Sequence, residues 1–130
     1  MTKALLCFAA IFGAAQPAHA DQVAFTGNTT ANVTLIKDAL HNILLYADAT
    51  AHCSSLESVE ARVISPAYKP ADAATRPEAG KGTYESWTVS LCGKPTRFLL
   101  TFWPASDGGT MFAVTVPYPA DAPTLLLSSQ

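Results

Sequence analysis

A long stretch of alternating apolar and polar residues, Tyr84 to Val116, constrains the fold more than any other part of this chain. It contains three alternating segments, 83–92, 96–103 and 110–116, separated by short segments rich in Gly and Pro. Alternation with a period of two is typical of half-buried strands, and Gly with Pro is typical of the turns between them. The stretch therefore predicts three strands of an antiparallel meander, with turns at 93–95 and 104–109.

The meander has two faces, because successive side chains of a strand point in opposite directions. Trp103 shares the parity of Arg97 and Thr101, so we expect it on the outer face. There it is a candidate partner contact, together with Tyr84, unless it packs under the C-terminal tail or a long loop. The opposite face is predicted to be buried and collects these large apolar residues: Trp87, Val89, Leu91, Phe98, Leu100, Phe102, Phe112, Val114 and Val116.

The segments upstream predict one helix and one more strand. Apolar residues recur at three- and four-residue spacing from about residue 30 or 32 to 51, which predicts an amphipathic helix capped by Thr or Asn. Residues 57–65 alternate and predict the first strand, whereas the polar segment 21–28 is expected to be a frayed lead-in. The expected fold class is α+β: one N-terminal amphipathic helix packed on a four-stranded antiparallel sheet. The predicted apolar stripe of the helix comprises Val33, Ile36, Leu40, Ile43, Leu44 and Ala47, widened by Leu35 and Leu45.

Two irregular segments flank the strands. Residues 66–82 are rich in Pro, Ala and Gly, and they predict a long surface loop that is either a mobile connector or a binding lid or partner-contacting arm. The Pro-rich tail, 118–130, is excluded from a central strand. For its leucines, 125–127, three outcomes are open: they cover a sheet edge, they dock on a partner, or they stay disordered. Residues 21–117 are thus expected to form a single domain, followed by a flexible tail.

The first twenty residues have the pattern of a secretory signal peptide. Lys3 precedes an apolar run at 4–15, and small residues end at Ala18-His19-Ala20. The run is too short to span a bilayer. We therefore expect cleavage after Ala20, a periplasmic or secreted location, and no membrane span in the mature chain. Loss of Lys3 leaves seven Lys and Arg against ten Asp and Glu, and this net charge of −3 argues against a nucleic-acid partner.

Two cysteines, Cys53 and Cys92, remain in the mature chain, since Cys7 leaves with the signal peptide. An oxidising compartment favours a disulfide between them. Closing a loop of about 40 residues stabilises a fold by roughly 4 kcal/mol in the chain-entropy model. We expect the bridge at the end of a strand, where the chain turns at Gly93.

The mature chain lacks the short motifs of common enzyme classes, such as a G-x-S-x-G elbow, a phosphate-binding glycine loop, a C-x-x-C pair or H-E-x-x-H. His41 and His52 are about 16 Å apart along the predicted helix and cannot share a metal. Asp48 and His52 are spaced to form an ion pair. A catalytic Cys53 beside them would leave Cys92 unpaired, so we expect no catalytic residue, no metal site and no cofactor.

Neighbouring carboxylates also predict no acid–base site. Glu57 and Glu60 have opposite parity along a strand, and Glu78 and Glu85 flank the long loop. Neither pair implies a fixed separation suited to proton transfer. No nucleophile, base and orienting group converge at one predicted location.

The string E-S-W-T-V-S-L-C-G-K at 85–94, with the aromatic strand and the D-G-G-T turn at 107–110 that follow it, resembles a family of small exported bacterial proteins. These proteins are of uncharacterised function and carry the motif E-x-W-x-V-x-x-C-G. The resemblance covers the last part of the mature chain and an upstream partner cysteine, which Cys53 matches. It implies export, a cysteine pair and a Gram-negative periplasmic address. It implies no activity, so no catalytic residue is carried over.

Three classes of function fit these observations. The leading one is a non-enzymatic binding or interaction module in the periplasm or outside the cell, such as an inhibitor, an immunity factor or an envelope-assembly accessory with a protein partner. The second is a structural envelope protein. The third is a small-ligand carrier or small hydrolase that uses a cavity between helix and sheet. A cavity lined by Trp87 and Phe98 would favour the carrier, whereas a solid core and an exposed patch around Trp103 would favour partner binding.

Overall fold

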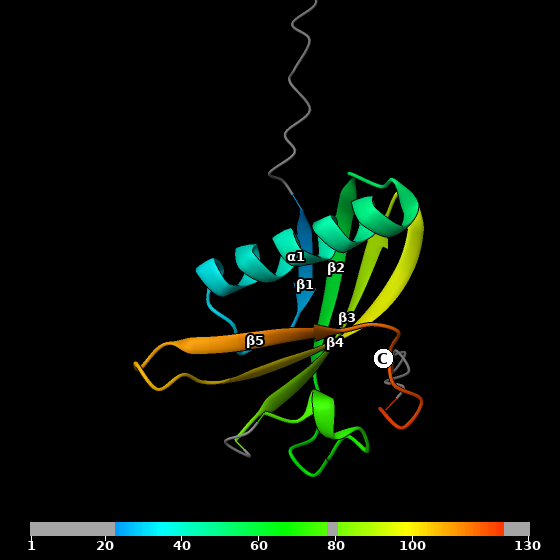
Figure 1. Ribbon diagram of the computed structural model, residues 1–130. Helices are drawn as coiled ribbons and strands as arrows, with labels where there is room; N and C mark the ends of the chain where they lie inside the picture. The colour runs from blue at the N-terminus through cyan, green and yellow to red at the C-terminus, as the bar shows by residue number, and fades with distance from the viewer. Residues whose placement is uncertain (1–22, 78–80, 124–130) are drawn as a thin grey trace, which may run out of the picture.

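The computed structural model describes residues 23–77 and 81–123 of the chain. In these residues one α-helix lies across one face of a five-stranded sheet (Figure 1). The predicted signal peptide and residues 125–127 lie outside the described residues. No helix within the described ranges is long and apolar enough to cross a membrane. The elements are β1 (Ala24–Gly27), α1 (Val33–Ala51), β2 (Leu56–Val63), the short 3-10 helix η1 (Ala73–Thr75), β3 (Thr83–Leu91), β4 (Lys94–Pro104) and β5 (Thr110–Thr115).

The sheet is mixed, and its spatial order follows the chain from β1 to β5. The strands β2 to β5 pair antiparallel, which confirms the four predicted strands. Strand β1 pairs parallel with β2, so the prediction of a purely antiparallel four-stranded sheet with a frayed lead-in is wrong there. Four residues are too few to carry a recognisable alternation. The strand is held by its pairing with β2 and by the ring of Phe25, which packs edge-on against Trp87 with 5.3 Å between centroids.

Helix α1 begins where its capping residue predicts. Asn32 Oδ1 accepts a hydrogen bond from Leu35 N–H at 2.8 Å, which satisfies one of the free N–H groups of the first turn. The helix ends at Ala51, and its C-cap, His52, adopts a left-handed conformation and donates its N–H to Asp48 O. The residues of the helix that are fully buried against the sheet are Ala39, Ile43 and Ala47.

The apolar face of α1 is narrower than predicted. Val33 and Leu45 are 69% and 55% exposed, although both were expected to contribute to that face. Leu45 is two residues from the buried Ile43, about 200° around the helix, so the two side chains cannot face the same sheet. Val33 is the first residue of the helix. It lines an open groove beside β1, the edge strand of the sheet, and so stays exposed.

The inner face of the meander is confirmed. Its nine predicted residues all belong to the hydrophobic cluster that contacts α1: Trp87, Val89, Leu91, Phe98, Leu100 and Phe102 are buried, and Phe112, Val114 and Val116 are partly buried against them. Trp87 and Phe98 have no exposed surface. Parity along the strands therefore predicts correctly which side of the sheet the helix covers.

The turn between β3 and β4 begins one residue earlier than predicted. Cys92 and Gly93 occupy its two central positions with φ of 48° and 79°. Positive φ at both positions is the geometry of a two-residue type I′ hairpin. Lys94 already pairs with Leu91 in the ladder, so the predicted turn at 93–95 is wrong by one position.

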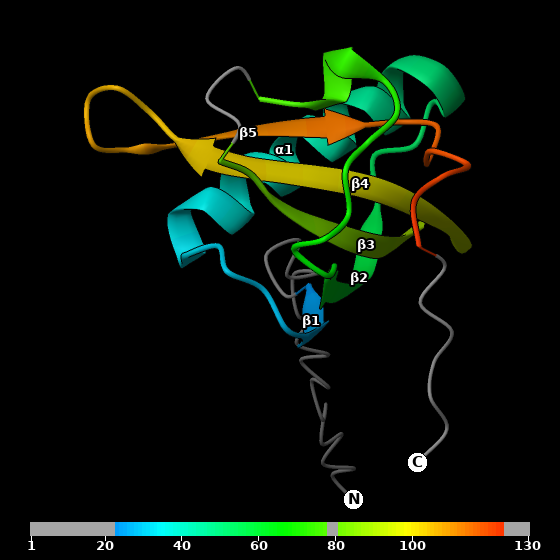
Figure 2. The ribbon, with the colours of Figure 1, turned by 90° about the horizontal axis from the view of Figure 1, so that it is seen from below.

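The outer face of the sheet carries a second, smaller cluster. Tyr84, Leu99 and Ile64 are buried there, with Tyr68 and Tyr118 packed against them. Tyr68 comes from the segment after β2 and Tyr118 from the segment after β5. Both segments run over the face opposite α1 (Figure 2). The described part of the long loop, 66–77, is therefore not simply a solvated connector.

The predicted disulfide joins Cys53 to Cys92, with Cα atoms 6.0 Å apart. Cys53 follows the end of α1, and Cys92 lies in the turn between β3 and β4. The bridge thus ties the helix to the sheet at the end of a strand, as expected.

Candidate partner-binding site

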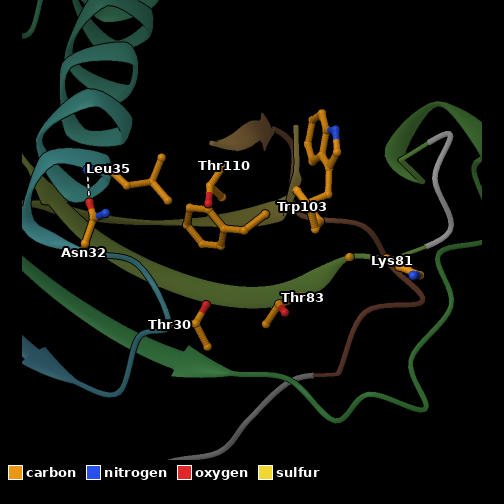
Figure 3. A pocket seen from close by; sticks show the side chains of 10 residues that line it. Thr30, Asn32, Leu35, Lys81, Thr83, Trp103 and Thr110 are labelled. Atoms are coloured by element: carbon orange, nitrogen blue, oxygen red, sulfur yellow. Dashed lines mark hydrogen bonds between the residues drawn. The ribbon is translucent and has the colours of Figure 1, made fainter. Parts of the chain in front are cut away.

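A pocket of about 520 Å³ opens at the end of the sheet beside the start of α1 (Figure 3). In Figure 3, Asn32 and Leu35 lie at one end of it and Trp103 and Lys81 at the other. We call it the Trp103 pocket. Its lining residues come from four elements and the segments beside them: Thr30, Asn32, Leu35, Lys81, Gly82, Thr83, Phe102, Trp103, Pro104 and Thr110.

Trp103 is half-buried and belongs to neither hydrophobic cluster. It lies near the end of β4, opposite Met111 of β5, and Met111 is 51% exposed. The hairpin that carries both residues reaches beyond the first turn of α1 in both views (Figure 1, Figure 2). The parity of Trp103 along β4 places its side chain on the outer face, as predicted. Neither hydrophobic cluster includes Trp103, so the side chain stays accessible.

The Trp103 pocket offers hydrogen-bonding groups beside an aromatic ring. Its side chains offer threonine hydroxyls, one ammonium group at Lys81 and the ring of Trp103. None of its lining residues is Asp, Glu, His, Cys or Ser. The lining can donate and accept hydrogen bonds around an aromatic surface.

A buried carboxylate holds one wall of this pocket in place. Glu85 has no exposed surface and accepts hydrogen bonds from Thr30 N–H at 2.7 Å, from the Thr30 hydroxyl at 2.9 Å and from the Thr29 hydroxyl at 2.8 Å. Its fourth donor is Trp87 Nε1–H at 2.7 Å. The residues that lead into α1 are thereby fixed to the inner face of β3, and Thr30 lines the pocket.

The role of Glu85 was missed in the sequence, where it is paired with Glu78 as a flank of the long loop. One signal could have found it. Glu85 shares the parity of Trp87, Val89 and Leu91, so it had to point toward the core. A buried carboxylate needs several donors, and nothing in the local pattern identifies Thr29 and Thr30 as those donors.

Tyr84, the second candidate contact, is only 9% exposed. The ring of Tyr68 covers it, with 5.3 Å between centroids and planes at 81°. Burial raises the pKa of Tyr84, an effect that the charge of Arg76 partly offsets. The expectation that this side chain contributes to an exposed patch is therefore wrong, because the segment after β2 folds back over it.

Tyr68 is itself perturbed by its place in the outer cluster. Burial, followed by the negative charge of Asp121, raises the pKa of Tyr68 to about 12. Asp121 also accepts a hydrogen bond from Ala71 N–H at 2.8 Å, which joins the two segments that cover the outer face.

The other candidate groups lie apart. His41 is exposed on α1 beside β1, and His52 caps the other end of the helix. Cys53 is bonded to Cys92, which rules out a catalytic thiol at either position. In the described ranges, no three His, Cys, Asp or Glu side chains gather where they could hold a metal ion.

No protein-family model, curated protein or solved structure matches this chain.

Proposed function

We propose that this protein is an exported, non-enzymatic binding module, and that the Trp103 pocket together with Met111 contacts a protein partner in the cell envelope. The observation that carries the proposal is the position of Trp103: half-buried at a pocket, opposite a 51% exposed Met111, and outside both hydrophobic clusters. A large aromatic side chain left in this state is available to a partner.

The composition of the site supports protein recognition. Tryptophan is among the residues that contribute most to protein interfaces, and methionine adapts its shape to a partner surface. The threonines and Lys81 supply a polar rim around this apolar centre. An inhibitor, an immunity factor and an assembly accessory would all use such a surface.

The alternative, a carrier or small hydrolase, has less support. It would need a cavity lined by Trp87 and Phe98 at the centre of the helix–sheet interface, and aromatic rings pack against both residues there. Trp87 contacts Phe25 and Phe102 at 5.3 and 6.2 Å between centroids, and Phe98 contacts Tyr46 at 5.9 Å. Two grooves between α1 and the sheet lie at the sheet's edges, one of about 640 Å³ beside β1 and one of about 490 Å³ beside β5, and neither is lined by Trp87 or Phe98.

The address in the envelope is part of the proposal. The Cys53–Cys92 disulfide fits an oxidising compartment, and the predicted signal peptide supplies a route to it.

Site-specific photo-crosslinking tests the proposed site. The mature chain carries a photoreactive phenylalanine analogue at position 103 and, in a matched control, at position 45, since Leu45 is 55% exposed on α1 and lies outside the pocket. We expect a discrete adduct with an envelope protein from position 103 and none from position 45. The proposal fails if both positions give the same adducts, or if position 103 gives none while the variant folds with an intact disulfide.

A further inference from the structure

The open edge of β5 is the feature that leads beyond the Trp103 pocket. In the part of the chain that the structure describes, β5 has β4 on one side and no strand on the other. Its residues, T-M-F-A-V-T, include no charge and no proline, and all are exposed or half-buried. Charges, prolines or bulges normally protect such an edge from pairing with another chain. The other edge strand, β1, is only four residues long and ends at Gly27 with φ of 89°.

The hairpin fixes which backbone groups of β5 face outward. Ala105 N–H donates to Gly109 O at 2.8 Å, so these two residues form a hydrogen-bonded pair. Such pairs alternate along an antiparallel ladder, which makes Trp103–Met111 and Thr101–Ala113 the next hydrogen-bonded pairs. The residues between them point the other way. The N–H and C=O groups directed at the open edge are those of Thr110, Phe112 and Val114.

We propose that β5 pairs antiparallel with β5 of a second copy of this chain, with Phe112 opposite Phe112 of that copy. In this register Thr110 and Val114 also lie opposite each other, twice by symmetry. All three outward-facing residues then have partners, and each opposed pair exchanges two hydrogen bonds, about six in all. The result is a two-fold symmetric dimer with one continuous sheet.

The side chains of β5 favour a second copy as the occupant. In the same register, Met111 lies opposite Ala113 of the second copy, so the exposed long side chain meets a small one on the outer face. On the inner face two Phe112 rings meet, an aromatic cross-strand pair. Because β5 carries no charged residue, the two paired strands do not repel each other. Strand and register are thus complementary to themselves in size and polarity.

A groove beside β5 provides further apolar surface for the dimer. It has a volume of about 490 Å³, and Asn42 and Tyr46 of α1 form one wall. The other wall is Phe112, Ala113, Val114 and Val116. Because neighbouring strands lie about 4.8 Å apart, the inward side chains of an added strand would occupy this groove next to Tyr46.

Sedimentation of the mature, disulfide-bonded chain tests the dimer. We expect a concentration-dependent monomer–dimer equilibrium. Thr110→Pro, at the exposed first residue of β5, removes an N–H that points away from β4, so it leaves the internal ladder intact while deleting a hydrogen bond twice by symmetry. It should weaken the dimer at least about tenfold, with the unfolding midpoint little changed. A monomer at every concentration up to about 1 mM, or a dimer insensitive to this variant, overturns the proposal.

Cysteine crosslinking tests the register independently of affinity. Met111→Cys and Ala113→Cys chains, mixed and mildly oxidised, should form a disulfide-linked heterodimer, since directly opposed residues have Cα atoms within disulfide range. Either variant alone should not crosslink, because two copies of the same position are displaced along the strands. Crosslinking of a single variant alone, or none in the mixture, overturns the register. A chain that stays monomeric but accepts a strand from another protein along β5 likewise refutes the second copy as the occupant.

Discussion

Replacing Glu85 with Gln should destabilise the fold by about 2–4 kcal/mol, although the two side chains have nearly the same shape. Each carboxylate oxygen accepts two hydrogen bonds, and Glu85 itself has no exposed surface. Oε1 accepts from Thr30 N–H and from the Thr30 hydroxyl, and Oε2 accepts from the Thr29 hydroxyl and from Trp87 Nε1–H. Every donor is neutral, so no charged side chain is among the hydrogen-bond partners of Glu85.

The magnitude follows from which donors can adapt. The amide nitrogen of Gln cannot accept a hydrogen bond, and it must replace one of the two oxygens. It then faces either Thr30 N–H or Trp87 Nε1–H, and neither of these can become an acceptor, whereas the hydroxyls can rotate. One donor is left unsatisfied in either orientation, at a cost of about 1–3 kcal/mol: near the upper end for Trp87 Nε1–H, which is buried, and near the lower end for Thr30 N–H, which is only partly buried. The hydrogen bonds that remain also lose the contribution of the charge, which accounts for the rest.

Urea unfolding followed by tryptophan fluorescence measures this difference, because Trp87 is a partner of Glu85. Glu60→Gln is the matched control. Glu60 is half-buried in β2 and pairs with Arg62 at 2.9 Å, and a surface ion pair of this kind contributes less than about 1 kcal/mol. If Glu85→Gln costs no more than Glu60→Gln, the four hydrogen bonds are not what holds the residues before α1 in place.

Three further predictions concern the two tryptophans, the disulfide and the outer face. Trp87→Ala should cost about 3–5 kcal/mol as a core deletion, whereas Trp103→Ala should lower the thermal midpoint far less while weakening partner capture; equal drops in midpoint would place Trp103 in the core. Reduction of the Cys53–Cys92 bridge should lower the free energy of unfolding by roughly 4 kcal/mol, measured by urea unfolding with and without reductant, and an unchanged midpoint would contradict this. Because the pKa of Tyr68 is raised to about 12, the contribution of Tyr68 to the free energy of unfolding is fully present below the unfolded pKa of about 10 and is lost as the pH rises toward 12. Tyr68→Phe should flatten that decline. Parallel profiles of unfolding free energy against pH for the two proteins would count against burial of Tyr68 as its cause.

Periodicity predicted the part of the fold that follows from the pattern within each strand. Each large apolar residue of the inner face of β3, β4 and β5 was predicted correctly, because a half-buried strand alternates apolar and polar side chains. Strand β1 does not meet that condition. Its four residues are ordered by partners far away in the sequence, Val59 in β2 and Trp87 in β3, and no pattern within them reports those contacts.

Parity also cannot say what covers a face. It correctly separated Trp103 and Tyr84 from the inner residues, but the two have different surroundings. Tyr84 lies under Tyr68, which belongs to a segment without periodicity, whereas Trp103 lies outside the outer cluster. Whether a side chain on this face is buried or accessible thus depends on how an irregular loop folds back over it. The sequence pattern does not predict the course of that loop.

The segment between β1 and α1 links the stability of the fold to the proposed site. Thr30 donates two hydrogen bonds to Glu85 and also lines the Trp103 pocket, so both depend on the same backbone position. A carboxylate on the inner face of a small protein is costly unless its donors are held rigidly, and here they hold one wall of the pocket. Glu85→Gln should therefore reduce photo-crosslinking from position 103 more than Glu60→Gln does, in samples adjusted to the same folded fraction. Equal crosslinking would mean that the wall formed by Thr30 is not needed for the contact, even if Trp103 is.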